Sequence, residues 1–367
     1  MAADGPVLGR RALGRATLDR QGLLARTHTS VPDLLERLVG LQGQVPGVPY
    51  TALWSRLADF DPATLSAAMA DRSVVRAPLM RTTLHTVTAR DALALQPLMA
   101  PVLARTFAST SWGKRLRGVD LGEAFAVARE LVAERPRTRA ELGGLLGARF
   151  PDLDGTSLGW AFGYLEPVVQ ATPRGLWRRS GPPAFTTMAA WLGAAPSAMA
   201  VSELVRRYLA GFGPASVRDA QAWCGLTRLR EVTDTIDLRR YRAEDGTELL
   251  DLPDAAVPDP DVPAPVRFLP EYDNALLGYA DRSRMGVGPL VVGPPTHGPG
   301  GALGTVLVDG VVAATWMLRH DDGARLTVTP SGPLGAGARD AVDAEAAAVA
   351  RFLTTGEEAT VVVDDPA

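Results

Sequence analysis

Cysteine and lysine are nearly absent from this 367-residue chain. Cys224, in the apolar stretch AQAWCGL, is the one cysteine. A single thiol excludes an internal disulfide and a cysteine-rich zinc site, and it suits a reduced, cytoplasmic setting. Lys114 is the one lysine, so almost all of the 38 basic residues are arginine.

Long apolar runs and cofactor motifs are missing as well. No uninterrupted apolar stretch reaches the roughly 18 residues of a membrane helix, so we expect no membrane span. The N-terminal stretch MAADGPVLGRRALGRATLDRQG has no apolar core, so we expect no export signal. Because no phosphate-cradling glycine loop, metal-ligand spacing or Ser/His/Asp order stands out, we expect neither a metal nor a cofactor.

What is present is typical of a folded protein. Apolar residues make up 46% of the chain and charged residues 22%, which excludes a disordered chain. With 367 residues the chain is too long for one ordinary core. We expect two to four modules at the usual ~100–200 residues per domain.

The net charge of −3 argues at first against a nucleic-acid partner. The arginines are nevertheless grouped, while the acids gather in stretches such as DLPDAAVPDPD and GEEATVVVDDPA. A chain that is acidic overall can still present one basic face, although biased genomic composition explains single arginine pairs equally well. The groups are Arg10, Arg11 and Arg15; Arg135, Arg137 and Arg139; Arg178 and Arg179; and Arg239, Arg240 and Arg242.

Residues 10–90 show the element order of a winged helix-turn-helix module. Leucines at helical spacing predict a helix over 31–42, and PYTALWSRLADF predicts a second helix. A third helix follows, with Asp61 as its cap and Pro62 at its first position. The stretch LMRTTLHTVT then alternates as a strand does.

The same order recurs twice after a helical connection over 91–133. In the second copy we expect Thr138 and Ser157 to cap helices, and GLWRRSG and PAFTTM to form the wing strands. In the third copy, SVRDAQAWCGL and TRLREVTDTI are helical, and Asp245-Gly246 predicts a two-residue hairpin turn.

The C-terminal part is different in character. A connector rich in Pro and Asp leads into short strands in RFLPEYDNALLGY, GTVLVDGVVAATWMLRH and ARLTVTP, with turns at Asp309-Gly310 and Asp322-Gly323. A helix in ARDAVDAEAAAVARFLT and a strand in ATVVVD close the chain. We predict a partial β-barrel there.

The predicted fold is therefore α+β and mostly helical, with three tandem winged helix-turn-helix modules and a small C-terminal β-barrel-like module. The predicted division is winged helix 1 over 10–90, the helical connection over 91–133, winged helix 2 over 134–195, winged helix 3 over 196–254, and the connector with the β-rich module over 255–367.

Winged helices commonly bind DNA, with one helix in the major groove and the wing against the backbone. Arginines on the second and third predicted wings suit phosphate contacts. Winged helices also serve as docking or structural modules, so the fold alone does not decide the function. The candidate phosphate contacts on these wings are Arg178, Arg179, Arg239, Arg240 and Arg242.

Six stretches are distinctive, namely LVGLQGQVP, PYTALWSRL, RTTLHTVTARD, GLWRRSGPPAF, DAQAWCGL and FLPEYDNALLGYADRSR, the last being the most specific. Together they resemble the AlkZ-like DNA glycosylases, and the resemblance covers nearly the whole chain. The family implies three tandem modules and a small barrel arranged as a C-shaped clamp. Its catalytic signature of Gln, an aliphatic residue and Gln matches Gln42 and Gln44, with Gly43 in the aliphatic place.

The resemblance implies a monofunctional glycosylase that excises bulky alkylpurines, including interstrand crosslinks at guanine N7. An N7-alkylated purine is already a good leaving group, so the protein has to add an oriented water and suitable dipoles. The carboxamides of Gln42 and Gln44 would hold that water. The residues alone favour a structural interpretation, in which both amides satisfy carbonyls at a helix end before Pro46, and the family resemblance reverses that preference.

Other expectations follow from the same resemblance. Arg76, Arg81 and His85 near the first wing would contact DNA, although His85 is as readily a packing residue, and Asp273 and Asn274 suit a structural role. The expected partner is double-stranded DNA with alkylated purines, bound by a monomer in the cytoplasm at the nucleoid. The rival readings are a non-catalytic DNA-binding or lesion-sequestering protein and a protein-interaction scaffold.

Overall fold

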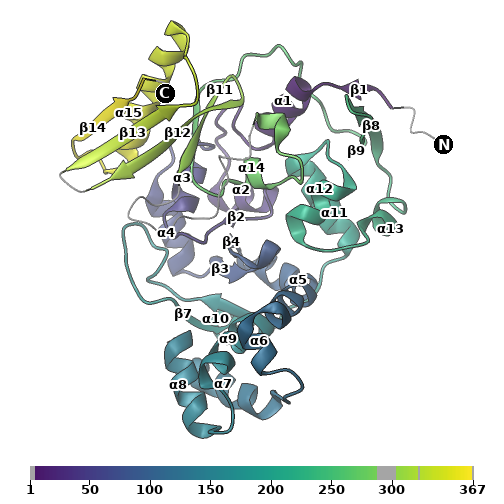
Figure 1. Ribbon diagram of the computed structural model, residues 1–367, viewed down its shortest axis with the longest axis vertical. Helices are drawn as coiled ribbons and strands as arrows, with labels where there is room; N and C mark the ends of the chain where they lie inside the picture. Colours follow the sequence, from purple (N-terminus) through teal and green to yellow (C-terminus); the bar gives the residue numbers. More distant parts are fainter. Residues whose placement is uncertain (1–4, 287–302, 321–322, 366–367) are drawn as a thin grey trace.

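The computed structural model describes residues 5–286, 303–320 and 323–365, and it shows a mixed α+β fold with three separate sheets (Figure 1). The largest sheet has six strands in the order β2-β4-β3-β6-β7-β5. β3 pairs with β6 at Arg76 and Gln170, so strands of the first two predicted modules form one continuous sheet, although β3 and β6 lie in stretches predicted as largely helical. The strands are β2 (Leu41–Gln42), β3 (Val74–Pro78), β4 (Leu84–Thr88), β5 (Arg137–Thr138), β6 (Val168–Gln170) and β7 (Ala184–Thr187).

Three short helices pack beside β2, β3 and β4 and supply the first core. Leu34, Leu35 and Leu38 are fully buried there, as their helical spacing predicts. Asp61 accepts a hydrogen bond from Ala63 N at 2.8 Å, which confirms the predicted cap. The helices are α2 (Val31–Arg37), α3 (Val48–Trp54) and α4 (Pro62–Ala70).

The helix predicted over 31–42 ends early, at Arg37. Val39 and Gly40 have φ values of 53° and 90°, and two left-handed residues in succession cannot continue a right-handed helix. The chain turns there and enters β2. The prediction that the candidate glutamines lie at a helix end is therefore wrong, because Gln42 belongs to a strand.

The second unit lies at the bottom of Figure 1 and is mostly helical. Thr138 caps its helix in a reciprocal capping box with Glu141, as predicted. The predicted cap Ser157 is wrong. Asp154 is the cap, accepting from Ser157 N at 3.0 Å, and Ser157 is buried in the first turn. The helices are α5 (Ala89–Ser109), α6 (Ser111–Arg115), α7 (Gly122–Glu134), α8 (Arg139–Arg149), α9 (Gly155–Leu165) and α10 (Met188–Leu192).

The third unit combines helices with a small sheet in which β1 runs parallel to β8. The predicted two-residue turn is wrong, because four residues separate the two hairpin strands. Gly246, with a φ of 83°, donates to Ala243 O at 2.9 Å, which makes a longer turn around a left-handed glycine. The elements are β1 (Val7–Leu8), α1 (Arg10–Arg20), α11 (Val201–Phe212), α12 (Val217–Cys224), α13 (Leu229–Thr233), β8 (Arg239–Ala243) and β9 (Glu248–Asp251).

The C-terminal sheet is open, so the barrel-like prediction needs correction. Its order is β10-β11-β12-β13-β14, and within the described residues the edge strands β10 and β14 do not pair with each other. A helix closes this core instead, with Val342, Ala346 and Val349 packed against the sheet. The elements are β10 (Arg267–Leu269), β11 (Gly304–Val308), β12 (Val311–Arg319), β13 (Ala324–Pro330), α15 (Ala336–Leu353) and β14 (Ala359–Val363).

Two further local predictions can be compared with this unit. The turn at Asp309-Gly310 is confirmed, because Val308 and Val311 are directly paired across it. Asp322 of the second predicted turn lies outside the described residues. The stretch after β10 is not a strand but the short helix α14 (Asn274–Leu277), capped by Asp273.

The predicted wing strand GLWRRSG is also not a strand. Residues 173–183 form turns that leave the six-stranded sheet and cross the first core. Trp177 lies between Tyr50 and Phe352, at ring-centroid distances of 4.8 and 5.2 Å. Tyr50 also donates to Gly175 O at 2.8 Å, which holds the segment in place. The segment therefore ties the second unit to α15.

Buried ion pairs join segments far apart in the sequence. Arg20 binds Asp251 and Arg56 binds Asp273, both at 2.7 Å and almost without solvent exposure. Breaking one partner of such a pair typically costs about 3–5 kcal/mol, since it leaves a buried charge. These pairs hold α1 against β9, and the turn after α3 against the start of α14.

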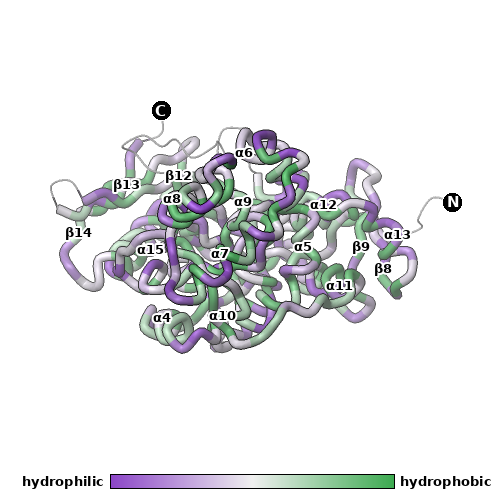
Figure 2. The backbone as a smooth tube through the Cα atoms, turned by 90° about the horizontal axis from the view of Figure 1, so that it is seen from below, coloured by the Kyte–Doolittle hydropathy of each residue, from purple (hydrophilic) through white to green (hydrophobic). Residues whose placement is uncertain are grey.

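Hydrophilic and hydrophobic residues are interspersed along the whole chain (Figure 2). Among the described helices, none combines the length and the apolar character that crossing a membrane requires.

Candidate active site

The two candidate glutamines lie on the edge of the six-stranded sheet. Gln42 is directly opposite His85 on β4, and Gly43 N donates to Leu84 O at 2.7 Å. Gln42 is the last residue of β2, whereas Gln44 follows in a bend just beyond the strand. Gln42 is buried and Gln44 is exposed.

Gln44 replaces a main-chain bond of the sheet. In a regular antiparallel ladder, Leu84 N would return its bond to Gly43 O. Here Gly43 O accepts from Arg76, and Leu84 N donates to Gln44 Oε1 at 3.2 Å instead. The Gln44 oxygen is thus anchored to β4, which leaves its NH₂ group to the exposed side.

Gln42 is anchored by an arginine. Arg81 Nη2 donates to Gln42 Oε1 at 2.9 Å, and Arg81 Nη1 donates to Trp223 O at 3.0 Å. Arg81 belongs to the 3₁₀ turn Met80–Thr82 between β3 and β4 and has a φ of 52°. Both candidate amides therefore have one oxygen lone pair engaged by a protein donor.

Arg76 lies beneath the glutamines rather than on the surface. It is 1% exposed, and its guanidinium donates to Gln170 Oε1 and to Gly43 O. Burial lowers the pKa of Arg76 to about 10, with a further contribution from the charge of Arg174. The expectation that Arg76 contacts DNA does not fit this position.

Gly43 faces this buried arginine in a tightly packed place. A Cβ added at Gly43 would lie 2.8 Å from Thr86 Oγ1 and 3.5 Å from Arg76 Nε. An aliphatic side chain there would require Thr86 to move. The glycine is thus matched to Thr86 and Arg76 in this chain, and it leaves the strand geometry of Gln42 intact.

His85 is fully buried and does not reach a surface where DNA would lie. Its Nδ1 is 3.0 Å from Thr83 O, which assigns the proton to Nδ1 and leaves Nε2 without a partner among the described residues. Burial and then the charge of Arg81 lower the pKa of His85 to about 3. The imidazole is therefore neutral at physiological pH.

The site is positively charged without nearby acidic partners. Within the described residues, Arg76 and Arg81 bind only amide and carbonyl oxygens. Burial lowers the pKa of Arg81 to about 10, and the charge of Arg282 adds to this effect. Both groups stay cationic at neutral pH, so the surroundings of Gln42 favour an anion such as a phosphodiester.

The remaining candidate DNA contacts differ in the protein partners that their guanidinium groups have. Arg178 is exposed but donates to Thr355 Oγ1 at 2.6 Å, whereas exposed Arg179 has no side-chain partner in the described part of the chain. Arg240 is paired with both Glu248 and Asp234. Arg239 stacks on Tyr241 at 4.9 Å, and Arg242 lies on the same strand.

Asn274, which the sequence suggested for a structural role, donates from Nδ2 to Gly40 O at 2.7 Å, so α14 holds the turn that precedes β2. Two further contributors to the site were not identified from the sequence. Gln170 positions Arg76 from the second unit. Arg282, half-buried, is the other, and the stretch GYADRSR in which it lies was noted only as a family-like motif. None of these contacts is local in sequence.

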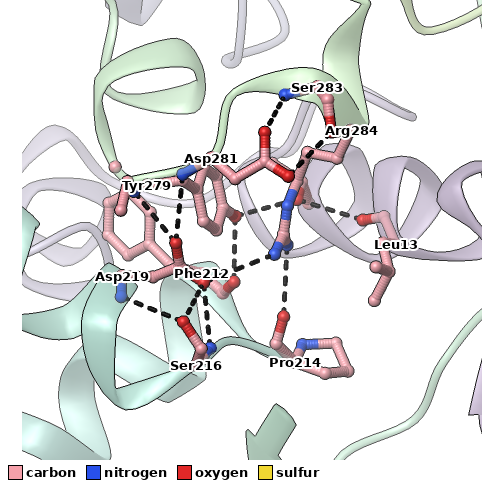
Figure 3. A network of polar contacts seen from close by, with 12 residues as sticks. Leu13, Phe212, Pro214, Ser216, Asp219, Tyr279, Asp281, Ser283 and Arg284 are labelled. Carbon is pink, nitrogen blue, oxygen red and sulfur yellow. Dashed lines mark hydrogen bonds and ion pairs between the residues drawn. The ribbon is translucent and has the colours of Figure 1, made fainter. Parts of the chain in front are cut away.

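A cavity of about 340 Å³ lies elsewhere, between α1, α12, the β8–β9 hairpin and residues 280–284. Figure 3 shows the polar network beside it, in which Arg284 donates to Pro214 O and Asp219 binds Ser216. Its lining mixes arginines with several acids, so its charge does not favour an anion. It lies at the N-terminal end of α12, whereas Arg81 contacts the C-terminal end. In the described part of the chain, no cluster of His, Cys, Asp or Glu is suited to a metal.

Comparison with known proteins gives concordant results. The model of the family described as DNA glycosylase AlkZ-like matches residues 35–352. The interstrand DNA cross-link repair glycosylase of Streptomyces sahachiroi is 27% identical, over 91% of this chain and 94% of that protein. The solved structure of Streptomyces sahachiroi DNA glycosylase AlkZ is similar with a TM-score of 0.77 at 22% identity, over 98% of this chain and 100% of that one.

Proposed function

The chain belongs to the AlkZ-like DNA glycosylase family, and from this premise we propose that it hydrolyses the N-glycosidic bond of bulky N7- or N3-alkylpurines in duplex DNA. The product would be an abasic site. The observation that carries the proposal is the pair of carboxamides, Gln42 at the end of β2 and Gln44 just beyond it, each held by its oxygen.

Uncharged amides suit this chemistry. An alkylated purine carries a positive charge, so its glycosidic bond breaks toward an oxocarbenium-like sugar without a strong acid. The protein then has to hold one water on the anomeric face. The NH₂ groups and the remaining oxygen lone pairs of Gln42 and Gln44 can orient that water. Their fixed oxygens make the arrangement pre-organised.

We propose that the enzyme is monofunctional, which means that it removes the base without cleaving the DNA strand. Glycosylases that also cleave the strand need an amine nucleophile for a Schiff base. Lys114, the one lysine of the chain, belongs to α6, which packs with α5 and α9 away from β2. Water is then the nucleophile that remains at Gln42 and Gln44.

Crosslinked and bulky bases are suitable substrates for an open surface. A base that is covalently joined to the opposite strand cannot be rotated out of the stack into an enclosed pocket. Exposed Gln44, at the sheet edge, would approach the sugar without such rotation. Exposed arginines away from the strand, including Arg178, Arg179 and Arg239, would hold the duplex of a monomeric enzyme.

The decisive experiment is excision from a duplex with a single N7-alkylguanine, followed as abasic-site formation in single turnover. Gln42→Ala and Gln44→Ala should each reduce the rate about 100-fold or more, with DNA affinity retained. Gln221→Ala is the matched control, because its Oε1 also accepts from a backbone amide, Leu229 N, at 3.0 Å. Intact binding with no product from any alkylated duplex would instead identify a lesion-binding protein.

A further inference from the structure

Within the described residues, the Arg81 side chain joins Gln42 to the third unit through two hydrogen bonds. Its two terminal nitrogens donate in opposite directions, Nη2 to Gln42 Oε1 at 2.9 Å and Nη1 to Trp223 O at 3.0 Å. Trp223 is a firm anchor, because its ring is 1% exposed and packs against Tyr208 and Phe212 at centroid distances of 4.9 and 5.7 Å.

The carbonyl of Trp223 needs such a donor. It belongs to the last turn of α12, where helix carbonyls lack partners within the helix. An arginine at a helix C-terminus satisfies a free carbonyl and also interacts favourably with the helix dipole. The position of the Arg81 guanidinium is therefore determined by α12, independently of any DNA.

A guanidinium can only donate, and this determines the orientation of the Gln42 carboxamide. Oε1 must face Arg81, so the NH₂ group points away from it. A hydrogen bond from a cation is also stronger than a neutral one and draws electron density from the amide. Without Arg81, the carboxamide would be free to rotate and exchange its oxygen with its nitrogen.

The backbone indicates that Arg81 is held in this role. Arg81 and Thr82 have φ values of 52° and 59°, and two adjacent non-glycine residues in the left-handed region are strained. An arginine at a wing tip that binds a phosphate extends into solvent, and it does not need a strained backbone turn to do so. Here the turn keeps the guanidinium between two elements of the protein.

We propose that Arg81 is a positioning residue that acts through Gln42, rather than the phosphate contact that its place near the first wing suggests. It selects the amide orientation that presents the Gln42 NH₂ group to the water. The inference rests on the proposed function, since it assigns Gln42 a part in the reaction. It also makes α12 of the third unit part of the catalytic apparatus.

The test is a double-mutant cycle of Arg81→Ala with Gln42→Ala, using single-turnover excision and DNA affinity as separate readouts. Removing an outer partner that orients a reacting group typically costs about 10- to 100-fold. We expect Arg81→Ala to lower the rate by that factor, to change the dissociation constant for DNA by less than about twofold, and to add nothing in the Gln42→Ala background. Arg81→Lys, which reaches one acceptor but not both, should recover part of the rate.

Arg105→Ala is the matched control. Arg105 Nη2 donates to Gly225 O at 2.8 Å, so it also binds the end of α12 but does not contact Gln42. An equal loss of rate in Arg105→Ala would mean that loosening α12 is sufficient, and it would overturn the proposal.

Two other outcomes overturn the inference while leaving the enzyme a glycosylase. Weakened DNA binding with a reduced salt dependence would make Arg81 a phosphate contact. Losses that multiply in the double variant would show that Arg81 acts independently of Gln42. An inactive wild-type protein is a different failure, because it would remove the proposed function itself and this inference together with it.

Discussion

His85 is a buried neutral residue at the centre of the site. It lies opposite Gln42 on the paired strand, and its Nδ1 is bound to Thr83 O. Burial and the charge of Arg81 hold the pKa of His85 at about 3, well below its usual value. The imidazole therefore supports the strand on which Gln42 depends, and protonation would place a second charge beside Arg81.

This pKa predicts a specific pH dependence of stability. The folded pKa is lowered, so the stabilising contribution is complete above about pH 6.5 and is lost as the pH falls toward 3. At pH 5 the wild type should have lost about 2 kcal/mol more unfolding free energy than a His85→Phe variant, both relative to pH 7.5. Denaturant unfolding at the two pH values measures this. Parallel losses in the two proteins would contradict the assignment of a buried neutral imidazole.

At the scale of single residues, the sequence indicates which residues are candidates for the site but not whether their side chains are buried. Gln42 and Gln44 are candidates because they match a family motif, and the motif does not show how their side chains lie. Arg76 was placed on the DNA because it lies near a wing, yet its side chain is fully buried. Its partner Gln170 is 94 positions away, and no local pattern indicates such a contact.

Among the elements, β2 matters most because it carries Gln42 and leads into Gln44. It is only two residues long, and its neighbours Val39 and Gly40 are left-handed. Asn274 on α14 and Arg76 on β3 hold the chain on either side of it. A strand so short depends on contacts from other elements rather than on its own ladder.

Gly43 provides a test of how closely β2 is fitted to β4. The Cβ of Gly43→Ala would meet Thr86 Oγ1 at 2.8 Å, and overpacking of this kind typically costs about 1–3 kcal/mol. We expect lower stability and a slower excision rate, because relief of the contact displaces Gln42. Thr86→Ala in the same chain should restore much of both. Thermal unfolding and single-turnover excision measure the two effects.

Gly47→Ala is the control for that variant. Gly47 is close to Gln44 and has a φ of −80°, and a Cβ there would meet nothing within 4 Å. Its stability should stay unchanged or rise by about 0.4–1 kcal/mol. If the stability of Gly43→Ala is likewise unchanged or higher, the close approach of β2 to β4 does not require glycine at position 43.

Elements with strong local patterns were predicted well, and those determined by distant contacts were not. The predictions of Asp61 and Thr138 as helix caps are confirmed, because a capping side chain binds a backbone amide only two or three residues away. The strand predicted in GLWRRSG failed because Trp177 packs between Tyr50 and Phe352, at opposite ends of the sequence. The open C-terminal sheet was missed because α15 covers it.

On the scale of the whole molecule, the pairing of charges distinguishes the site from the rest of the protein. Buried arginines elsewhere, such as Arg20 and Arg56, bind carboxylates. Arg76 and Arg81 bind only neutral oxygens among the described residues. A chain with a net charge of −3 thus keeps unneutralised positive charge beside the candidate glutamines, and this charge favours the approach of DNA without a direct phosphate contact from Arg76 or Arg81.

The same reasoning separates arginines that bind DNA from those already neutralised. A phosphate contact releases a counterion, so removing it should reduce the slope of log K against log salt concentration by about 0.9. Arg179 is exposed without a side-chain partner in the described part of the chain, so Arg179→Gln should show this change. Arg240 is bound to Glu248 and Asp234, and Arg230 would still pair with Glu248 without it, so Arg240→Gln should leave the slope almost unchanged. Fluorescence anisotropy with an undamaged duplex at several salt concentrations measures both slopes. A larger effect for Arg240 than for Arg179 would mean that DNA displaces the ion pairs of β8, and the binding face would then lie on the third unit.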